Sequence, residues 1–154
     1  MNEEARFRAA VPKSWRAVFK VAEFIHRAGG RSIYIPPLVV REEFDQREGC
    51  GDYEDIRVGV NGKEIRVEVK WRTLAFTGFH DYPYPTVLID RMEKIGADHA
   101  DYYFIANRDL THACRISGET RKHWIGPVKR KDRDKGYEFD GIECPLDHVH
   151  FVKL

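Results

Sequence analysis

The sequence predicts a domain of mixed α/β class, an α+β fold with a mixed sheet, and three stretches carry that prediction. Residues 14–28 repeat apolar side chains at the spacing of an amphipathic helix. Residues 55–70 alternate apolar and polar side chains on both sides of an Asn-Gly pair, which is typical of a hairpin. Residues 102–106 form a short apolar run typical of a buried strand. The expected order is helix, strand, hairpin, helix, strand and then extra strands.

The first predicted helix, residues 14–28, has recognisable ends. Ser14 is expected to be its N-cap, and the two glycines at 29–30 are expected to stop it. Its apolar face would be formed by Trp15, Val18, Phe19, Ala22 and Ile25.

Two polar residues of this helix need an explanation. Glu23 lies close to the apolar edge, where it would either pair with Arg27 one turn later or point toward a site beneath the helix; the ion pair is the favoured alternative. His26 falls within the apolar face, which favours a hydrogen-bonded core histidine over a ligand.

The hairpin has a register that its turn determines. The Asn-Gly pair at 61–62 favours a two-residue type I′ turn, because both residues tolerate positive φ. Val60 would then pair with Lys63, and pairing outward from the turn places Asp55 opposite Glu68. Alternation along the strands predicts an apolar face made of Ile56, Val58, Ile65, Val67 and Val69, and a polar face made of Asp55, Arg57, Glu64, Arg66, Glu68 and Lys70.

Two opposed carboxylates require a compensating cation. At a separation of about 5 Å and an effective dielectric constant of about 20, Asp55 and Glu68 would repel by roughly 3 kcal/mol. Either Arg57 and Arg66 neutralise them in a checkerboard of ion pairs, or a divalent metal binds between them. The hairpin alone leaves both alternatives open.

The remaining elements follow from weaker patterns. Residues 32–40 are β-prone but interrupted by the prolines at 36–37, so a broken or edge strand is expected. Residues 86–96, TVLIDRMEKIG, place Leu88, Met92 and Ile95 on one stripe and predict a short second helix. Further strands are expected at 112–116 and 148–154.

The long connection at 72–85 is rich in aromatic residues. Connections of this length without secondary structure are uncommon in compact domains and are often functional. Packing of its aromatics on the protein body is the favoured interpretation, and stacking on bases or lining a substrate groove is the alternative. The aromatics are Phe76, Phe79, Tyr82 and Tyr84.

Composition limits the classes of function. The 154 residues suit one domain, and 33% charged residues with no long apolar run predict a soluble, cytoplasmic chain that does not enter a membrane. The three cysteines lack a CxxC spacing, which favours reduced thiols. The formal net charge is only +1, so nucleic-acid binding would depend on a local patch. The stretch 129–135, KRKDRDK, is one such patch, with a solvated loop favoured over phosphate contact.

The spacing of Asp55 and Glu68-Val69-Lys70 resembles the PD-(D/E)XK nuclease superfamily. The helix with an inward-leaning Glu23 and the order helix, three strands, helix, strand extend this resemblance over residues 14–106. It implies a restriction-endonuclease-like αβββαβ core with extra C-terminal strands. Glu54 stands where the motif has proline, and Asp52 is a rival for the metal-binding Asp, although the register places it on the other face.

The resemblance implies a divalent-metal-dependent nuclease. Asp55, Glu68 and the backbone carbonyl of Val69 would hold Mg²⁺ or Mn²⁺, with Glu23 completing the shell directly or through water. Lys70 would favour the hydroxide form of the attacking water, so the expected catalytic residues are Asp55, Glu68, Lys70 and Glu23. The metal would then relieve the repulsion between the two carboxylates.

DNA is the expected substrate, with RNA as the alternative. The candidate contacts are Lys129, Arg130, Lys131, Arg133, Arg72, His80 and Tyr82. Small members of the superfamily include junction resolvases, restriction-type endonucleases and phage or repair nucleases, and many of them act as homodimers. A dimer of this chain would be expected to use the first helix or residues after 106.

Two other functions compete with this one. A non-catalytic nucleic-acid-binding or interaction module would keep the same cluster as structure. A zinc site would use His148 and His150 with Cys144 and Asp147 nearby, although a third well-placed ligand is not evident.

Overall fold

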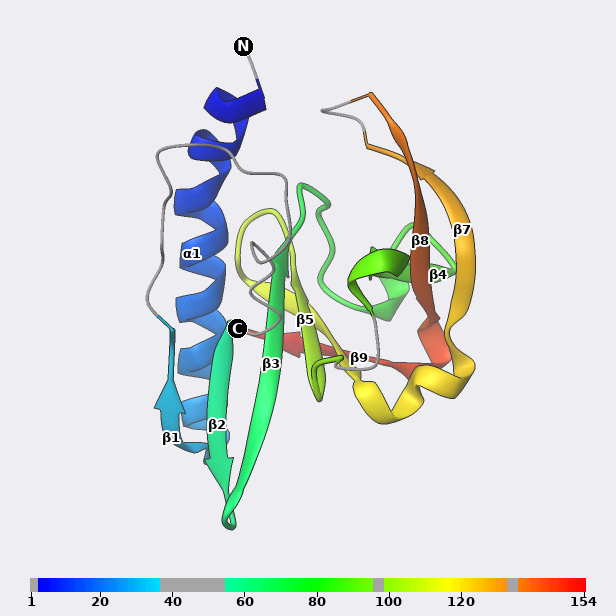
Figure 1. The fold of residues 1–154 in the computed structure, drawn as a ribbon. Helices are drawn as coiled ribbons and strands as arrows, with labels where there is room; N and C mark the ends of the chain where they lie inside the picture. Colours follow the sequence, from blue (N-terminus) through cyan, green and yellow to red (C-terminus); the bar gives the residue numbers. More distant parts are fainter. Residues whose placement is uncertain (1–2, 37–54, 96–98, 133–135) are drawn as a thin grey trace.

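One long helix and nine strands make up most of the described part of the protein. The computed structural model describes residues 3–36, 55–95, 99–132 and 136–154. Short 3-10 turns join several of the strands. The elements are α1 (Glu3–Arg27), β1 (Arg31–Tyr34), β2 (Ile56–Val60), β3 (Lys63–Trp71), β4 (Thr86–Arg91), β5 (Tyr102–Ala106), β6 (His112–Ser117), β7 (Ile125–Lys131), β8 (Glu138–Pro145) and β9 (Val149–Lys153) (Figure 1).

The strands form two sheets. The larger sheet has six strands in the order β1-β2-β3-β5-β6-β9, and the smaller has three in the order β4-β8-β7. β3 and β5 pair in parallel, whereas the other pairs of the larger sheet are antiparallel. A mixed sheet with one main helix confirms the predicted α+β class.

Helix α1 covers one face of the larger sheet. Its buried residues pack on alternate residues of β2 and β3 and on Phe104 of β5. The apolar face predicted for the hairpin is therefore confirmed as core. The buried residues of this cluster are Ala17, Val18, Val21, Ala22, Ile56, Val58, Val67, Val69, Phe104, Ala106 and Ala113.

Three details of α1 differ from the prediction. The helix begins at Glu3 instead of Ser14 and contains Pro12, because the Glu-, Ala- and Arg-rich stretch before Pro12 favours a helix strongly enough to continue it. His26 is exposed, so the expected core histidine is wrong. Phe19 is half exposed and does not belong to the buried face. The predicted end is confirmed to within one residue, since the helix ends at Arg27 and Gly29 has a φ of 95° in the turn that follows.

The hairpin has the predicted turn and register. Asn61 and Gly62 have φ angles of 48° and 76°, as a type I′ turn requires. Val60 pairs with Lys63, and the ladder continues outward from the turn to the last pair of β2 and β3. Side chains of β3 therefore face the predicted sides of the sheet.

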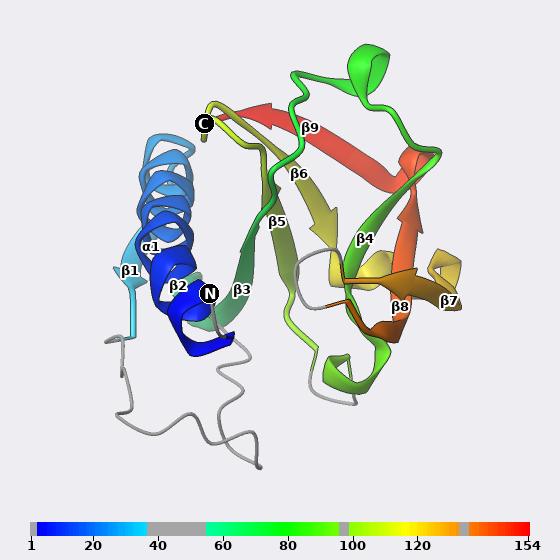
Figure 2. The ribbon, with the colours of Figure 1, turned by 90° about the horizontal axis from the view of Figure 1, so that it is seen from above.

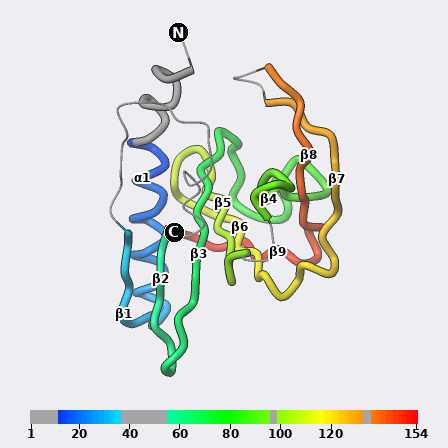
Figure 3. The backbone as a smooth tube through the Cα atoms, in the orientation of Figure 1, coloured from blue at the N-terminus to red at the C-terminus, as the bar shows by residue number. Residues whose placement is uncertain are grey.

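The predicted second helix at 86–96 is wrong. Residues Thr86–Arg91 form strand β4, which pairs with β8, and a 3-10 turn at Met92–Lys94 follows it. Val87 and Ile89 are fully buried, which is the alternation of a strand. The helix was predicted from the spacing of Leu88, Met92 and Ile95 instead. The crossover from β3 to the parallel β5 therefore passes through the second sheet, as Figure 3 shows.

The remaining predicted strands are confirmed at β5, β6 and β9. β1 ends at Tyr34, and residues 37–40 of the predicted broken strand lie outside the described residues. The predicted packing of the aromatics at 72–85 is confirmed for two of the four: Phe76 is buried, with its ring 5.2 Å from that of Tyr82 and 5.9 Å from that of Phe151. It is wrong for Phe79 and Tyr84, which are 61% and 48% exposed.

The smaller sheet covers part of the face opposite α1. Buried residues of β4 and β8 pack on Tyr103, Ile105, Cys114 and Ile116 of β5 and β6. The larger sheet thus lies between α1 and the smaller sheet (Figure 2). Within the described residues, no helix is both long and apolar enough to span a lipid bilayer.

Substitutions in β4 test the corrected strand. Ile89→Ala removes a fully buried side chain, and we expect it to lower the free energy of unfolding by about 2–5 kcal/mol. Met92→Ala is the matched control, because Met92 is 44% exposed and should cost under about 1 kcal/mol. Denaturant unfolding measures both. A larger loss of unfolding free energy in Met92→Ala than in Ile89→Ala would favour the predicted helix over the strand.

Candidate functional site

Four ionisable side chains meet where the two sheets join. Asp55 directly precedes β2, Glu68 and Lys70 lie on the face of β3 opposite α1, and Asp90 lies near the end of β4. Lys70 contacts both Glu68 and Asp90, and the charge of Asp55 acts on Glu68. We call these residues the carboxylate–lysine cluster.

Asp55 is held against β3 by two hydrogen bonds. Its backbone N–H donates to the carbonyl of Val67 at 2.9 Å, and its Oδ2 accepts from the N–H of Val69 at 2.7 Å. Because the N–H and C=O of a strand residue point to the same side, the Val69 carbonyl also faces the edge where Asp55 lies. The structure therefore brings together three of the predicted metal ligands.

Lys70 lies between two carboxylates. Its Nζ is 2.5 Å from Glu68 Oε1 and 2.8 Å from Asp90 Oδ2. Burial by itself would lower the pKa of Lys70, but the charges of Glu68 and Asp90 outweigh burial and raise that pKa. The same ion pair overcomes burial at Asp90 and lowers the pKa of its carboxyl. Lys70 is therefore an ammonium ion at neutral pH.

Glu68 is the incompletely satisfied member of the cluster. It is 8% exposed, and its Oε2 is buried with no hydrogen-bond partner among the described residues. Burial raises the pKa of Glu68 to about 7, with Lys70 opposing and Asp55 reinforcing the shift. An unpaired buried carboxylate oxygen costs free energy, which a bound cation would recover.

The cluster fits a hard divalent cation of the Mg²⁺ type. Mg²⁺ needs only one or two protein carboxylates when water and substrate phosphate supply its other ligands. Asp55 and Glu68 provide the carboxylates, and the Glu68 Oε2 lone pairs are the unfilled donor. Across the described ranges, no three His, Cys, Asp or Glu side chains converge on one metal position, so the fit depends on this pair and the Val69 carbonyl.

Sequence reasoning missed Asp90 because it placed residues 86–96 in a helix. The alternation of β-branched residues before Asp90 was the signal that would have indicated a strand ending near the site. Arg72, predicted to contact nucleic acid, directly follows the last residue of β3, two residues after Lys70, and its backbone N–H donates to the carbonyl of Ala106 at 3.0 Å. Burial lowers its pKa, with the charge of Asp90 opposing that effect.

The arginines of the hairpin do not supply the cation next to Glu68. Arg57 lies 4.0 Å from Glu64, and Arg66 donates to the backbone carbonyl of His99 at 3.0 Å. The cation that contacts Glu68 is Lys70, two residues along the same strand. The predicted arginine checkerboard is wrong for Glu68.

Glu23 is not part of the cluster. Its side chain is 61% exposed and lies 3.6 Å from Lys20, instead of pairing with Arg27 as favoured. Helix α1 packs on the face of β3 that carries Val67 and Val69, whereas Glu68 and Lys70 point to the opposite face. The sheet therefore separates Glu23 from the other predicted catalytic residues.

The basic stretch is a strand instead of the expected loop as far as Lys131. Lys129 lies 2.6 Å from Asp140, and Arg130 forms an ion pair with the buried Glu143. Lys131 is exposed, and Arg133 lies outside the described residues. Two of the predicted phosphate contacts thus have acidic partners within the smaller sheet.

The other residues predicted to contact nucleic acid or metal do not join the carboxylate–lysine cluster in the described part of the chain. His80 is exposed in the 3-10 turn at Phe79–Asp81, and Tyr82 is occupied by packing against Phe76 and Phe151. Asp52 and Glu54 lie outside the described residues.

The predicted zinc site is not assembled. His148 belongs to a 3-10 turn and stacks on His123 with ring centroids 4.1 Å apart, while His150 follows in β9 and is exposed. Cys144 is fully buried in the core between the sheets. The turn breaks the strand alternation that was expected to place both histidines on one face.

Comparison with known proteins found no match: no protein-family model fits the chain, and no curated protein or solved structure matches it.

The raised pKa of Glu68 predicts a pH-dependent stability. Between about pH 4.5 and 7 the folded protein keeps a proton that the unfolded chain has lost, so raising the pH through this window destabilises the fold. The raised pKa corresponds to a loss of about 3 kcal/mol of folding stability between these two pH values, and Glu68→Gln should remove this loss because the amide does not titrate. In EDTA, we therefore expect the variant to gain stability over the wild type as the pH rises to 7, with no further gain above.

Denaturant unfolding across this range measures the effect. Glu64→Gln, which changes an exposed carboxylate on the same strand, is the matched control. If the difference in unfolding free energy between Glu68→Gln and the wild type did not change with pH, the raised pKa of Glu68 would be contradicted.

Proposed function

We propose that this protein is a divalent-metal-dependent nuclease that hydrolyses phosphodiester bonds, with DNA as the preferred substrate. The observation that carries the proposal is the buried, unpartnered Oε2 of Glu68, next to Asp55 and to a lysine that stays charged. A buried carboxylate with an unused oxygen is a ready cation ligand.

Each residue of the cluster would have a distinct role. Asp55, Glu68 and the Val69 carbonyl would hold Mg²⁺ or Mn²⁺, and such an ion, when bound, supplies positive charge that polarises a phosphodiester and activates water. The Lys70 ammonium would stabilise negative charge that develops on the phosphate. Because its pKa is raised, Lys70 would not act as the proton acceptor.

Asp90 would be a positioning residue. Its Oδ2 lies 2.8 Å from Lys70 Nζ and belongs to the smaller sheet, whereas Glu68, the other partner of Lys70, belongs to the larger sheet. The lysine is thus anchored in one place relative to both sheets, which is what preorganised charge stabilisation requires.

The order of elements supports a restriction-endonuclease-like core in part. The antiparallel β1, β2 and β3 are followed by β5 parallel to β3, and α1 precedes them. The crossover contains β4 instead of the second helix of the αβββαβ order. A homodimer remains a prediction that size-exclusion chromatography with light scattering would test.

A cleavage assay tests the function directly. Labelled single-stranded, duplex, flap and four-way-junction DNA, and matching RNAs, are incubated with Mg²⁺, Mn²⁺ or EDTA. We expect metal-dependent cleavage that falls by at least about 100-fold in Asp55→Asn, Glu68→Gln and Lys70→Ala, because each removes a ligand or the charge that stabilises the transition state.

Glu23→Gln is the matched control, since this carboxylate lies on the far side of the sheet and should leave cleavage unchanged. A melting-temperature increase with Mn²⁺ that disappears in Glu68→Gln gives an independent readout of metal binding. Folded protein that binds Mn²⁺ but cuts none of the substrates would favour the binding-module alternative. No Mn²⁺ effect at all would exclude the metal site.

Asp90→Asn tests the positioning role. We expect cleavage to fall about tenfold, less than for Lys70→Ala, because Lys70 would keep Glu68 as its partner. The variant should show an unchanged Mn²⁺ melting shift. Loss of that shift would instead make Asp90 a metal ligand.

A further inference from the structure

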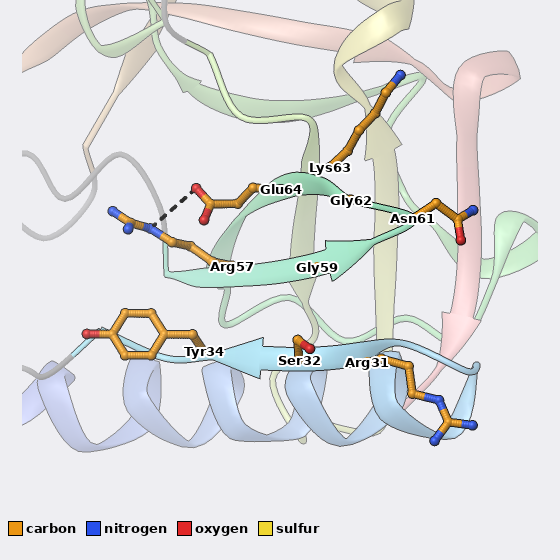
Figure 4. A pocket seen from close by; sticks show the side chains of 9 residues that line it. All are labelled: Arg31, Ser32, Tyr34, Arg57, Gly59, Asn61, Gly62, Lys63 and Glu64. Carbon is orange, nitrogen blue, oxygen red and sulfur yellow. Dashed lines mark ion pairs between the residues drawn. The ribbon is translucent and has the colours of Figure 1, made fainter.

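A basic groove lies on the same face of the larger sheet as the carboxylate–lysine cluster. It has a volume of about 620 Å³ and is formed by β1, β2 and the hairpin turn (Figure 4). Tyr34 pairs with Arg57, and Arg57 pairs with Arg66 of β3, so Tyr34 and Arg57 face the side that carries Glu68. From the spacing of strands and residues, the backbone of Tyr34 lies about 12 Å from that of Glu68.

The groove occupies a part of the sheet that the second sheet leaves open. The apolar contacts of the smaller sheet are with β5, β6 and β9, and the buried cluster between the sheets contains no residue of β1 or β2 among those the structure describes. The carboxylate–lysine cluster lies at the boundary between the covered and the open half. A chain lying along the open half would therefore lead to the cluster.

The groove presents cations and one exposed aromatic ring. Arg31, Arg57 and Lys63 line it with a single acidic residue, Glu64, which lies 4.0 Å from Arg57. Arg31 and Lys63 have no ion-pair partner in the described part of the chain. Tyr34 is 53% exposed, which is high for a large aromatic side chain in a strand.

We propose that this groove binds a single-stranded nucleic acid, with a base stacked on Tyr34 and the phosphate backbone along Arg31, Arg57 and Lys63. Cations along a groove with an exposed ring form the combination that binds single strands, because every base has a face that can stack. Base pairs of an intact duplex would not present that face. The proposal deepens the proposed function, since it names an unpaired strand as the substrate next to the cleavage site, and it rests on that function.

An acidic protein segment is the competing occupant. It would use the same cations but would gain little from an exposed tyrosine, whereas a nucleic acid uses both. The ring at one end of the groove and the arginine at the other therefore favour a nucleic acid (Figure 4).

Binding in EDTA tests the groove separately from cleavage. Fluorescence anisotropy would follow a labelled 12-nucleotide DNA strand, the same RNA strand, the DNA duplex and a glutamate 12-mer. We expect the single strands to bind at least tenfold more tightly than the duplex and the peptide. Tyr34→Ala should weaken single-strand binding about tenfold, and Tyr34→Phe should restore it.

Arg31→Ala combined with Lys63→Ala should reduce the slope of log K against log salt by about 1.4, as expected for two lost phosphate contacts. The matched controls are Tyr84→Ala, which changes another half-exposed tyrosine, and Lys122→Ala with Lys153→Ala, which changes two exposed lysines elsewhere. Both controls should bind like the wild type.

The outcomes separate the groove from the cluster. Cleavage that depends on Glu68, together with binding unaffected by Tyr34→Ala, would contradict the proposed binding groove and would still support the proposed nuclease activity. Tyrosine-dependent binding without any cleavage would support the groove as a binding site and count against the nuclease. Equal losses in Tyr34→Ala and Tyr84→Ala, or a glutamate peptide bound as tightly as DNA, would overturn the proposal.

Discussion

The backbone conformation at the hairpin turn is the constraint on which the rest of the site depends. Asn61 and Gly62 adopt positive φ angles, which few residue pairs tolerate, and this sets the pairing of β2 with β3. A slip of one residue would turn every side chain of β3 to the other face. Val67 and Val69 would then leave the helix-covered core, and Glu68 and Lys70 would enter it. The turn therefore determines both what is core and what is available for chemistry.

A second constraint acts across the two sheets. The Lys70 ammonium is shared by Glu68 of the larger sheet and Asp90 of the smaller one, inside a largely buried region. Removing one partner from such a group is costly, because it leaves a charge that is neither solvated nor paired. The ion pairs thus couple the relative position of the sheets to the geometry of the site. In the proposed nuclease, the same coupling would keep the lysine charge fixed next to the metal ligands.

The two faces of the larger sheet are used differently. One face packs on α1. On the other face, β4 and β8 cover one half, and no described residue of the smaller sheet packs on the half at β1 and β2, which we call the open half. The carboxylate–lysine cluster occupies the boundary, where the side chains are sheltered enough for burial to raise the pKa of Glu68 to about 7. The proposed strand-binding groove occupies the open half next to it. One face of the larger sheet therefore carries the buried carboxylate–lysine cluster and, next to it, the exposed groove proposed to bind nucleic acid.

The sequence by itself determined the local features of this protein: the α+β class, the hairpin register, the apolar face of β2 and β3, and the neighbouring positions of Asp55, Glu68 and Lys70. These depend on contacts between residues close in the chain, for which turn chemistry and alternation are sufficient. Only the tertiary structure decided that residues 86–91 form a strand, because their short apolar pattern fits both periods and the pairing with β8 settles the choice. It likewise decided that Asp90 joins the cluster and that Glu23 does not, since long-range packing places one element on each side of the sheet.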